Sequence, residues 1–298
     1  MSTFLEALKQ YADVDTNVPI SKITTFRIGG GADYVIYPKD AIAFSEAMRL
    51  ILQEKIPYKI LGKGSNILCS DEPFHGVIIR LDRHFHDYYY LDDKLFAQAG
   101  CSIISLAYDS MKKGFSGLEF ASGIPATIGG AVYMNAGAYK NCMKNVVEEV
   151  LVYREGVIDW VSSQECEFGY RTSVFHDKKD WVILAVRIAL SKGNSNEIRE
   201  LVENRRERRM SSQPLNFPSA GSVFRNPEGK FAWEYIDELG LRGKQIGGAQ
   251  ISEKHPNFII NVGEATAKDV YALIDLINKK MKEKYDFTLE MEVEKFNW

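Results

Sequence analysis

Short apolar runs and one amphipathic stretch alternate in the first part of the chain. Three runs of strand length are rich in apolar and β-branched residues: 34–37, 58–61 and 77–81. Between the first two, residues 41–55 carry an apolar face at helical spacing, formed by Phe44, Met48, Ile51 and Leu52. This alternation of strand, helix and strand predicts a small α/β lobe over residues 1–82.

The middle of the chain is richer in strands. Five further runs have the composition of strands: 88–91, 95–98, 150–154, 157–161 and 182–190. Glu155-Gly156 separates the third run from the fourth and predicts a hairpin. A helix is predicted at 104–113, ending at Gly114. We expect a second lobe of mixed α+β structure over residues 83–205.

A polar helix predicted at 196–210 leads into the last part of the chain, and its basic cluster, 205–209, is typical of a solvated helix face. We assign residues 206–298 to a third α+β domain. Four elements are predicted there: a helix at 232–239, a strand at 258–262, a helix beginning at the capping box of Thr266 and Asp269, and a strand at 289–294. On that final strand Glu290, Glu292 and Glu294 would share one face.

Composition and charge narrow the function classes. The chain has 298 residues, 45% of them hydrophobic, and its net charge of −3 gives no field that attracts nucleic acid. The four cysteines form no CxxC pair and the five histidines no HExxH motif, so we predict neither a disulfide framework nor a metal site. The sequence has no signal peptide and no run of the ~18 apolar residues that a membrane span needs. We therefore expect a cytoplasmic protein that binds neither membranes nor nucleic acids.

The segment Pro218–Pro227 gathers polar side chains in a stiff setting. Small residues around Ser222 let a ligand approach the backbone, and the prolines stiffen both ends. Ser222 can donate or accept a proton, Arg225 can bind phosphate or carboxylate, and Asn226 can donate and accept hydrogen bonds. A hydroxyl beside an anion binder indicates a site. No GxSxG motif surrounds Ser222, which argues against a covalent nucleophile.

Two glycine-rich stretches, 62–66 and 117–131, can present backbone N–H groups to a phosphate. Neither has the GxGxxG pattern of a Rossmann fold or the GxxxxGK[ST] pattern of a P-loop. Tight turns explain most stretches of this kind, whereas two of them in successive lobes indicate a nucleotide held between lobes. Spacing alone leaves both interpretations open.

Three other polar residues have a structural interpretation as well as a functional one. Arg171 follows a tight turn, and from sequence alone a surface arginine stacked on Tyr170 is favoured. Glu292 belongs to a row of like charges, for which a solvated strand face is favoured. His255 fits a substrate contact and a capped turn equally well.

Eight motifs stand out when taken together: Thr24–Gly30, Leu61–Asn66, Ser122–Ala131, Met134–Tyr139, Tyr170-Arg171, Pro218–Pro227, Gly247–Ser252 and Glu292-Val293. In their order along the chain they resemble the UDP-N-acetylenolpyruvoylglucosamine reductase (MurB) family of peptidoglycan synthesis. Together they span nearly the whole chain, and its length resembles that of the family's shorter, type II subtype.

The resemblance implies an α+β flavoprotein with two lobes of the vanillyl-alcohol-oxidase-like FAD fold and a third, substrate-binding domain. It implies tightly but non-covalently bound FAD and NADPH as co-substrate. The monomeric enzyme would reduce UDP-N-acetylglucosamine enolpyruvate to UDP-N-acetylmuramate. The positions that match the family's cofactor contacts are Gly62, Gly64, Ser65, Asn66, Gly123, Ile124, Pro125, Ala126, Gly129, Gly130, Ala131, Asn135 and Gly137. Those that match its substrate contacts are Tyr170, Arg225, Asn226, His255 and Asn257.

The resemblance also implies a catalytic group. Arg171 would stabilise an enolate, Ser222 would protonate carbon, and Glu292 would assist as an acid or orient a cation. The sequence departs from the family at Glu294, where arginine is frequent, so Glu290 competes with Glu292 for this role.

A second departure is Lys63, which stands where glycine is common and is expected to turn outward. Two other functions stay open: a flavin enzyme that oxidises an alcohol or hydroxy acid, and a non-catalytic nucleotide-binding protein on the same fold.

Overall fold

The chain forms two compact units, each assembled from separate stretches of sequence. The computed structural model describes residues 2–298. The larger unit comprises the stretch ending at Thr16, Tyr34–Lys63 and Gly76–Glu207, and the smaller comprises Asn17–Asp33, Gly64–His75 and Arg208–Trp298. The domain limits 1–82, 83–205 and 206–298 stay a prediction from sequence.

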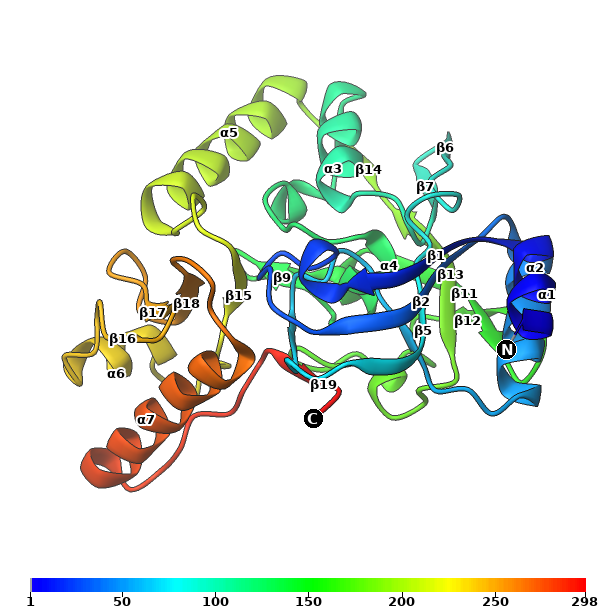
Figure 1. Ribbon diagram of the computed structural model, residues 1–298. Coiled ribbons are helices and arrows are strands. Elements are labelled where there is room, and N and C mark those ends of the chain that lie inside the picture. The colour runs from blue at the N-terminus through cyan, green and yellow to red at the C-terminus, as the bar shows by residue number, and fades with distance from the viewer. Residues whose placement is uncertain (1) are drawn as a thin grey trace. The chain divides into compact units, whose positions relative to one another are not determined.

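A five-stranded antiparallel sheet forms the centre of the larger unit (Figure 1), in the order β12-β11-β13-β7-β6. Its strands are β6 (Tyr88–Leu91), β7 (Lys94–Gln98), β11 (Val147–Arg154), β12 (Val157–Ser162) and β13 (Val182–Ala189). Alternate residues such as Leu95, Val150 and Val186 are buried, so one face of the sheet belongs to the core. The short helix α4 (Ile128–Tyr133) contacts β7 and β13, which places its glycine-rich entry loop against the sheet.

A second sheet has four strands in the order β1-β2-β5-β3. These are β1 (Ala12–Pro19), β2 (Gly31–Pro38), β3 (Tyr58–Ile60) and β5 (Phe74–Ile79). Helix α1 (Ser2–Tyr11) contacts α2 (Ala41–Gln53), whose first turn is capped by Asp40. Phe44 of α2 packs edge-on against Tyr153 of β11, with ring centroids 5.2 Å apart, so both parts of this unit share one core.

Shorter elements complete the larger unit: α3 (Ile103–Lys112), β8 (Phe115–Ser116), η2 (Glu119–Ala121), β9 (Gly137–Ala138), β10 (Asn141–Cys142), η3 (Met143–Asn145), η4 (Val174–His176), β14 (Ser191–Lys192) and most of α5 (Ser195–Ser212), whose residues from Arg208 onward belong to the smaller unit. In α5 the basic cluster is exposed at Arg206 and Arg208, whereas Arg205 is half-buried with its guanidinium over the Tyr139 ring. The expected solvated face therefore holds for only part of the cluster.

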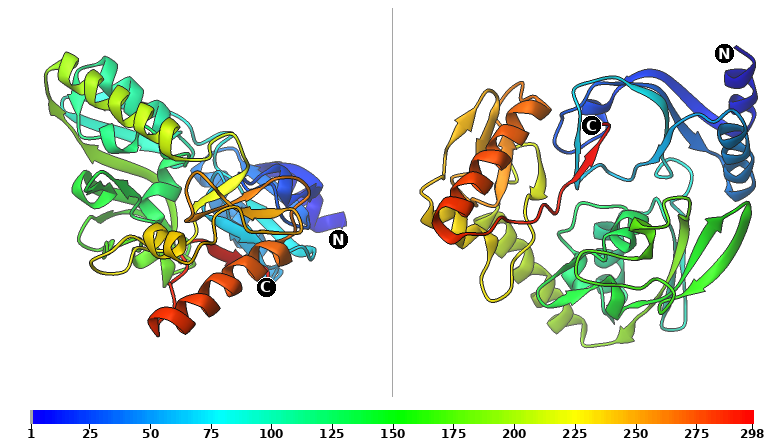
Figure 2. Two further views of the ribbon diagram at one scale, coloured as in Figure 1. Left: turned by 90° about the vertical axis from the view of Figure 1, so that its left-hand side faces the viewer. Right: turned by 90° about the horizontal axis from the view of Figure 1, so that it is seen from below.

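The smaller unit has a sheet of order β15-β18-β17-β16, seen beside α7 in Figures 1 and 2. Its elements are η1 (Ile20–Lys22), β4 (Ile67–Cys69), β15 (Ser219–Ser222), α6 (Ala232–Glu238), β16 (Gln245–Ile246), β17 (Ala249–Ile251), β18 (Phe258–Asn261), α7 (Ala267–Tyr285) and β19 (Glu294–Phe296). The predicted apolar face of α7 is buried at Val270, Leu273, Ile274, Ile277 and Met281.

The start of α7 confirms the predicted capping box. Thr266 accepts a hydrogen bond from the N–H of Asp269, whose carboxylate accepts one from the N–H of Thr266. Asp71, from a distant part of the chain, accepts hydrogen bonds from the N–H groups of Ala267 and Lys268. All three N–H groups of the first turn therefore have partners.

The predicted strand at 289–294 is wrong. Only Glu294–Phe296 is a strand (β19), and it pairs in parallel with β4. The preceding residues turn to meet Val223–Arg225 instead, through an isolated bridge between Phe224 and Met291. The three glutamates therefore do not share one strand face, because pairing with two different partners breaks the period of two. Within residues 2–298, no helix is long and apolar enough to cross a membrane.

Candidate functional site

Ser222 lies at the end of an irregular strand. In the pairing of β15 with β18, Ser219 is opposite Ile260 and Ser222 is opposite Phe258, so β15 holds one extra residue. Gly221 accommodates this bulge with a φ of +79°, a conformation that glycine adopts without strain. Ser222 is half-buried, and no group within residues 2–298 makes a hydrogen bond with its Oγ. The hydroxyl is therefore available to a ligand.

Glu292 is held next to the Ser222 strand by its backbone. The N–H of Glu292 donates to Val223 O at 2.8 Å, and Glu292 O accepts from Asn66 Nδ2 at 3.0 Å. Its competitor Glu290 is directed elsewhere: Glu290 Oε1 forms an ion pair with Arg225 Nη1 at 3.0 Å, and its side chain is 70% exposed. The choice between Glu292 and Glu290 for the catalytic role stays a prediction.

Asn257 fastens the same segment from the other side. Its side-chain amide donates to Phe224 O at 2.9 Å and accepts from the N–H of Phe224 at 3.0 Å. Its own carbonyl accepts from the N–H of Val223 at 2.8 Å. Asn257 is only 3% exposed, so this residue, predicted as a substrate contact, holds the Ser222 segment in place.

The other predicted substrate contacts of the smaller unit differ in their surroundings. Asn226 Oδ1 accepts from the N–H of Ala232 and caps the start of α6. His255 packs edge-on against Phe258 and against Trp233, and its Nδ1 is buried without a hydrogen-bond partner in the described residues. Burial lowers the pKa of His255 to about 4, so the ring is neutral at pH 7.

Arg171 lies in the larger unit, on a turn closed by reciprocal hydrogen bonds between Gly169 and Thr172. It has a φ of +56°, which is strained for a residue with a side chain. Its Nη2 donates to Gly137 O at 2.8 Å, and its guanidinium lies 5.3 Å from the centre of the Tyr170 ring. The expected stacking on Tyr170 is present, and the hydrogen bond to the Gly137 carbonyl also orients the guanidinium.

Asn135 is the buried support of that turn. Its Nδ2 donates to Gly169 O at 2.7 Å, and its Oδ1 accepts from the N–H of Lys144. Gly137 is equally constrained, because a Cβ atom there would lie 2.5 Å from Asn141 O. Both were predicted as cofactor contacts. In the structure Asn135 holds the turn that carries Arg171, and Gly137 accepts a hydrogen bond from the Arg171 side chain.

Gly62 of the first glycine-rich loop and Thr127 of the second meet within the larger unit. A Cβ atom added at Gly62 would lie 2.6 Å from Thr127 Oγ1, so the loops approach more closely than any side chain would allow. None of the N–H groups of Gly62, Lys63, Gly64 and Ser65 donates to another described residue. Lys63 is exposed, as expected. Consecutive N–H groups without protein acceptors form a surface suited to phosphate oxygens.

The second loop uses most of its N–H groups internally. Those of Ile128, Gly129 and Gly130 donate to Cys101 O, Ala99 O and Thr127 Oγ1. Of the predicted contacts at Gly123, Ile124, Pro125, Ala126, Gly129, Gly130 and Ala131, only the N–H of Gly123 has no acceptor among the described residues. This loop therefore offers a ligand mainly shape, whereas the first loop offers hydrogen-bond donors.

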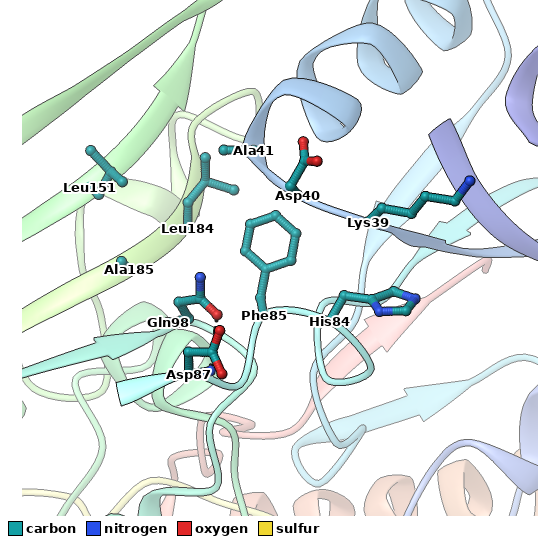
Figure 3. Close-up of a pocket in the computed structure, with 10 residues that line it drawn as sticks. All are labelled: Lys39, Asp40, Ala41, His84, Phe85, Asp87, Gln98, Leu151, Leu184 and Ala185. Atoms are coloured by element: carbon teal, nitrogen blue, oxygen red, sulfur yellow. Dashed lines mark hydrogen bonds between the residues drawn. The ribbon is translucent and has the colours of Figure 1, made fainter. Parts of the chain in front are cut away.

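A cavity of about 210 Å³ in the larger unit lies elsewhere (Figure 3). Its lining comprises Lys39, Asp40, Ala41, His84, Phe85, Asp87, Gln98, Leu151, Leu184 and Ala185. None of the predicted site residues is among them. In the part of the chain that the structure describes, no three His, Cys, Asp or Glu side chains are grouped to hold a metal ion.

Comparison with known proteins decides the family. Residues 32–158 match the family described as "FAD binding domain", and residues 213–296 match "UDP-N-acetylenolpyruvoylglucosamine reductase, C-terminal domain". The UDP-N-acetylenolpyruvoylglucosamine reductase of Anoxybacillus flavithermus is 42% identical over 282 residues, covering 94% of this chain and 93% of that protein. The chain belongs to the UDP-N-acetylenolpyruvoylglucosamine reductase family.

Solved structures agree with this membership. The reductase (MurB) of Thermus caldophilus has a TM-score of 0.84 at 34% identity, covering 96% of this chain and all 100% of that one. A Physcomitrella patens BBE-like 1 structure, at 12% identity and a TM-score of 0.50 over 63% of this chain and 44% of that one, shares the fold alone. The predicted vanillyl-alcohol-oxidase-like FAD fold of α+β class is confirmed for this reductase-family chain.

Proposed function

We propose that Arg171, Ser222 and Glu292 carry the proton and charge chemistry of this protein's reaction. The protein is a UDP-N-acetylmuramate dehydrogenase of peptidoglycan precursor synthesis. With FAD as cofactor and NADPH as reductant, it reduces UDP-N-acetylglucosamine enolpyruvate to UDP-N-acetylmuramate. The observation that carries the residue assignment is the hydroxyl of Ser222, which is half-buried on a glycine bulge and has no acceptor or donor within residues 2–298.

The residues of the first glycine loop fit the pyrophosphate of FAD. Gly62, Lys63, Gly64 and Ser65 offer N–H groups without protein acceptors, and the lack of a side chain at Gly62 lets Thr127 pack against it. We assign to this loop the hydrogen bonds to the cofactor phosphates, and to Gly123–Ala131 the close van der Waals contact. When bound, FAD supplies the hydride chemistry.

Ser222 delivers a proton to carbon. Addition of hydride to the vinyl group of the substrate leaves negative charge on the neighbouring carbon, spread into its carboxylate as an enolate. An unassisted serine is a weak acid, but a carbanion-like enolate is basic enough to take its proton. The bulge at Gly221 fixes the direction of the hydroxyl, and alignment matters more for this step than a shifted pKa.

Arg171 and Glu292 stabilise the charge that develops. A guanidinium can place two donors on a carboxylate that is becoming an enolate. The hydrogen bond to Gly137 O keeps Arg171 in one orientation, and its strained backbone is consistent with a residue placed for function. Glu292 donates a hydrogen bond to the enolate carboxylate when protonated, or orients the cation. Tyr170, Arg225, Asn226 and His255 are the proposed direct substrate contacts.

The enzyme acts as a monomer in the cytoplasm, where the UDP-linked substrate and NADPH are available. Two FAD lobes, 1–82 and 83–205, and a substrate domain, 206–298, are the proposed functional divisions of the chain.

Replacement of Ser222 tests the assignment. Ser222→Ala should retain FAD and oxidise NADPH at the wild-type rate, because that half-reaction needs no proton from Ser222. Reoxidation of the reduced flavin by the enolpyruvyl substrate should slow by several orders of magnitude in rapid mixing. Ser222→Cys, which keeps a protic group at the position, should recover part of that rate. Equal slowing of both half-reactions in Ser222→Ala would show that Ser222 is not the proton donor.

A further inference from the structure

Thr25 contacts two segments that the proposed function uses. Its N–H donates to Gly64 O at 3.1 Å, inside the first glycine loop. Its Oγ1 lies 2.7 Å from Ser219 O, at the start of the strand that ends in Ser222, and 3.3 Å from Gly64 O. Thr25, Gly64 and Ser219 all belong to the smaller unit. One residue therefore hydrogen-bonds to the phosphate-facing loop and to the strand of the proton donor.

The distances indicate that the hydroxyl and the backbone N–H of Thr25 each donate one hydrogen bond. A threonine hydroxyl has a single proton, and the shorter distance directs it to Ser219 O. The backbone N–H of Thr25 is left to hold Gly64 O. Loss of the hydroxyl would thus release β15 selectively, while Gly64 keeps its backbone bond.

Close packing makes this connection stiff. Gly64 has a φ of +61°, and a Cβ atom there would lie 2.8 Å from Thr24 Cγ2 and 2.9 Å from Thr24 Cα. The backbone of Gly64 thus lies directly against the Thr24-Thr25 peptide. On the other strand, Pro218 O accepts from the N–H of Asn261, which ties the start of β15 to the sheet. A change in position at Gly64 is therefore transmitted to Ser219.

A second connection joins the same loop to Glu292. Asn66 Nδ2 donates to Glu292 O at 3.0 Å, and the N–H of Glu294 donates to Asn66 O at 3.1 Å. The loop thus holds the segments of Ser222 and Glu292 through separate residues. Thr25 makes the connection on the Ser222 side.

We propose that Thr25 is a positioning residue that sets the place of Ser222 relative to the first glycine loop, and hence to the cofactor that the loop holds. This inference rests on the proposed roles of Ser222 and of the loop. Thr25 acts through its hydrogen bonds to Ser219 and Gly64. Its hydroxyl fixes Ser219, at the start of β15, against the loop, while the bonds to Asn257 hold Val223 and Phe224 on the other side of Ser222.

Thr25→Val removes the hydroxyl but keeps the shape of the side chain, and Thr25→Ser keeps the hydroxyl but removes the methyl group. Thr24→Val is the matched control. The Oγ1 of Thr24 lies 3.3 and 3.4 Å from Ile20 O and Ile28 O, both outside the site segments. The three variants therefore separate loss of this particular hydrogen bond from loss of any threonine hydroxyl in the same loop.

The first measurement is rapid mixing of each half-reaction. Thr25→Val should slow reoxidation of the flavin by the enolpyruvyl substrate at least tenfold, with reduction by NADPH changed less than twofold. The solvent deuterium isotope effect on reoxidation should rise, because proton delivery becomes slower. Thr25→Ser should recover the reoxidation rate to within about threefold, and Thr24→Val should leave both rates near those of the wild type.

The second measurement needs no cofactor. In apoprotein, hydrogen exchange read by mass spectrometry should be at least fivefold faster over residues 219–225 in Thr25→Val, and unchanged there in Thr25→Ser and Thr24→Val. Unchanged exchange, or equal slowing of both half-reactions, would overturn the inference. If Ser222→Ala leaves reoxidation intact, the proposed function fails. If Ser222→Ala blocks reoxidation while Thr25→Val does not slow it, only the role of Thr25 fails.

Discussion

The clamp between Asn257 and Phe224 can be removed without changing the number of side-chain heavy atoms. In Asn257→Leu the side chain keeps its branched shape, gains some volume because methyl groups replace the amide, and loses both hydrogen-bonding groups. The N–H and C=O of Phe224, bonded to the amide at 3.0 and 2.9 Å, then have no partner. Water cannot easily replace them, because Asn257 is 3% exposed and Phe224 is 1% exposed.

The expected loss of stability follows from these two groups. Each buried backbone group left unsatisfied costs about 1–3 kcal/mol, and hence about 2–6 kcal/mol for the pair. Burying leucine in place of a polar amide returns about 1–2 kcal/mol. We expect a net loss of about 3 kcal/mol, which lowers the Tm of a chain of this size by roughly 6–12 °C.

Urea unfolding and calorimetry check this value, with Asn278→Leu as the comparison. Asn278 makes the same reciprocal pair with Leu289, at 2.9 and 3.3 Å, but it is only half-buried. Leu289 is 4% exposed, so part of the cost remains, and we expect a loss of about 1–2 kcal/mol, smaller than that of Asn257→Leu. If Asn257→Leu is no less stable than Asn278→Leu, the backbone of Phe224 has other partners and the reasoning is wrong.

Two further predictions concern the smaller unit. Burial lowers the pKa of His255 from 6.5 to about 4, so the unfolded chain binds more protons between these values. The contribution of His255 to the free energy of unfolding should be complete above pH 6.5 and fall by up to about 3 kcal/mol toward pH 4. Urea titrations at pH 7, 5.5 and 4.5 should show that this pH dependence is lost in His255→Gln. If His255→Gln keeps the same pH dependence, other groups cause it. Asp71→Ala should cost about 1–2 kcal/mol, because Ala267 and Lys268 lose their acceptor. The stability of Asp71→Asn should lie between those of the wild type and Asp71→Ala in the same unfolding assay. A wild-type Tm in both variants would show that Asp71 does not stabilise the start of α7.

Local patterns predicted much of the fold. The capping box at Thr266, the apolar face of α7 and the hairpin at Glu155-Gly156 depend on neighbours within a few residues, and all are confirmed. The prediction of one strand at 289–294 was wrong, because the alternating sequence indicated a single strand whereas its residues pair with two distant segments. Sequence reasoning also missed α1, although its apolar residues recur at helical spacing, and β1, whose buried positions do not alternate.

The candidate site was predicted by residue type but not by contact. The polar residues around Ser222 pointed to a site, and the family resemblance supplied the roles, which stay predictions. Nothing in the sequence distinguished Asn257, a buried clamp, from a substrate contact, because both interpretations need the same amide. The same holds for Thr25, whose partners Gly64 and Ser219 are remote in sequence and meet only through the tertiary fold.

The composition of the smaller unit has a consequence for how the protein is made. Residues 17–33 and 64–75 leave the ribosome early, but most of their unit consists of residues 208–298. Strand β4 can pair with β19, and Thr25 can bond to Ser219, only after those later residues have been translated. The larger unit can reach most of its contacts during synthesis, whereas these two early segments lack their partners from residues 208–298 until that part of the chain has been translated. Assembly of the proton-donor segment is therefore a late folding event, and it is the step at which a chaperone would find exposed Phe26 and Leu68, both buried in the finished unit.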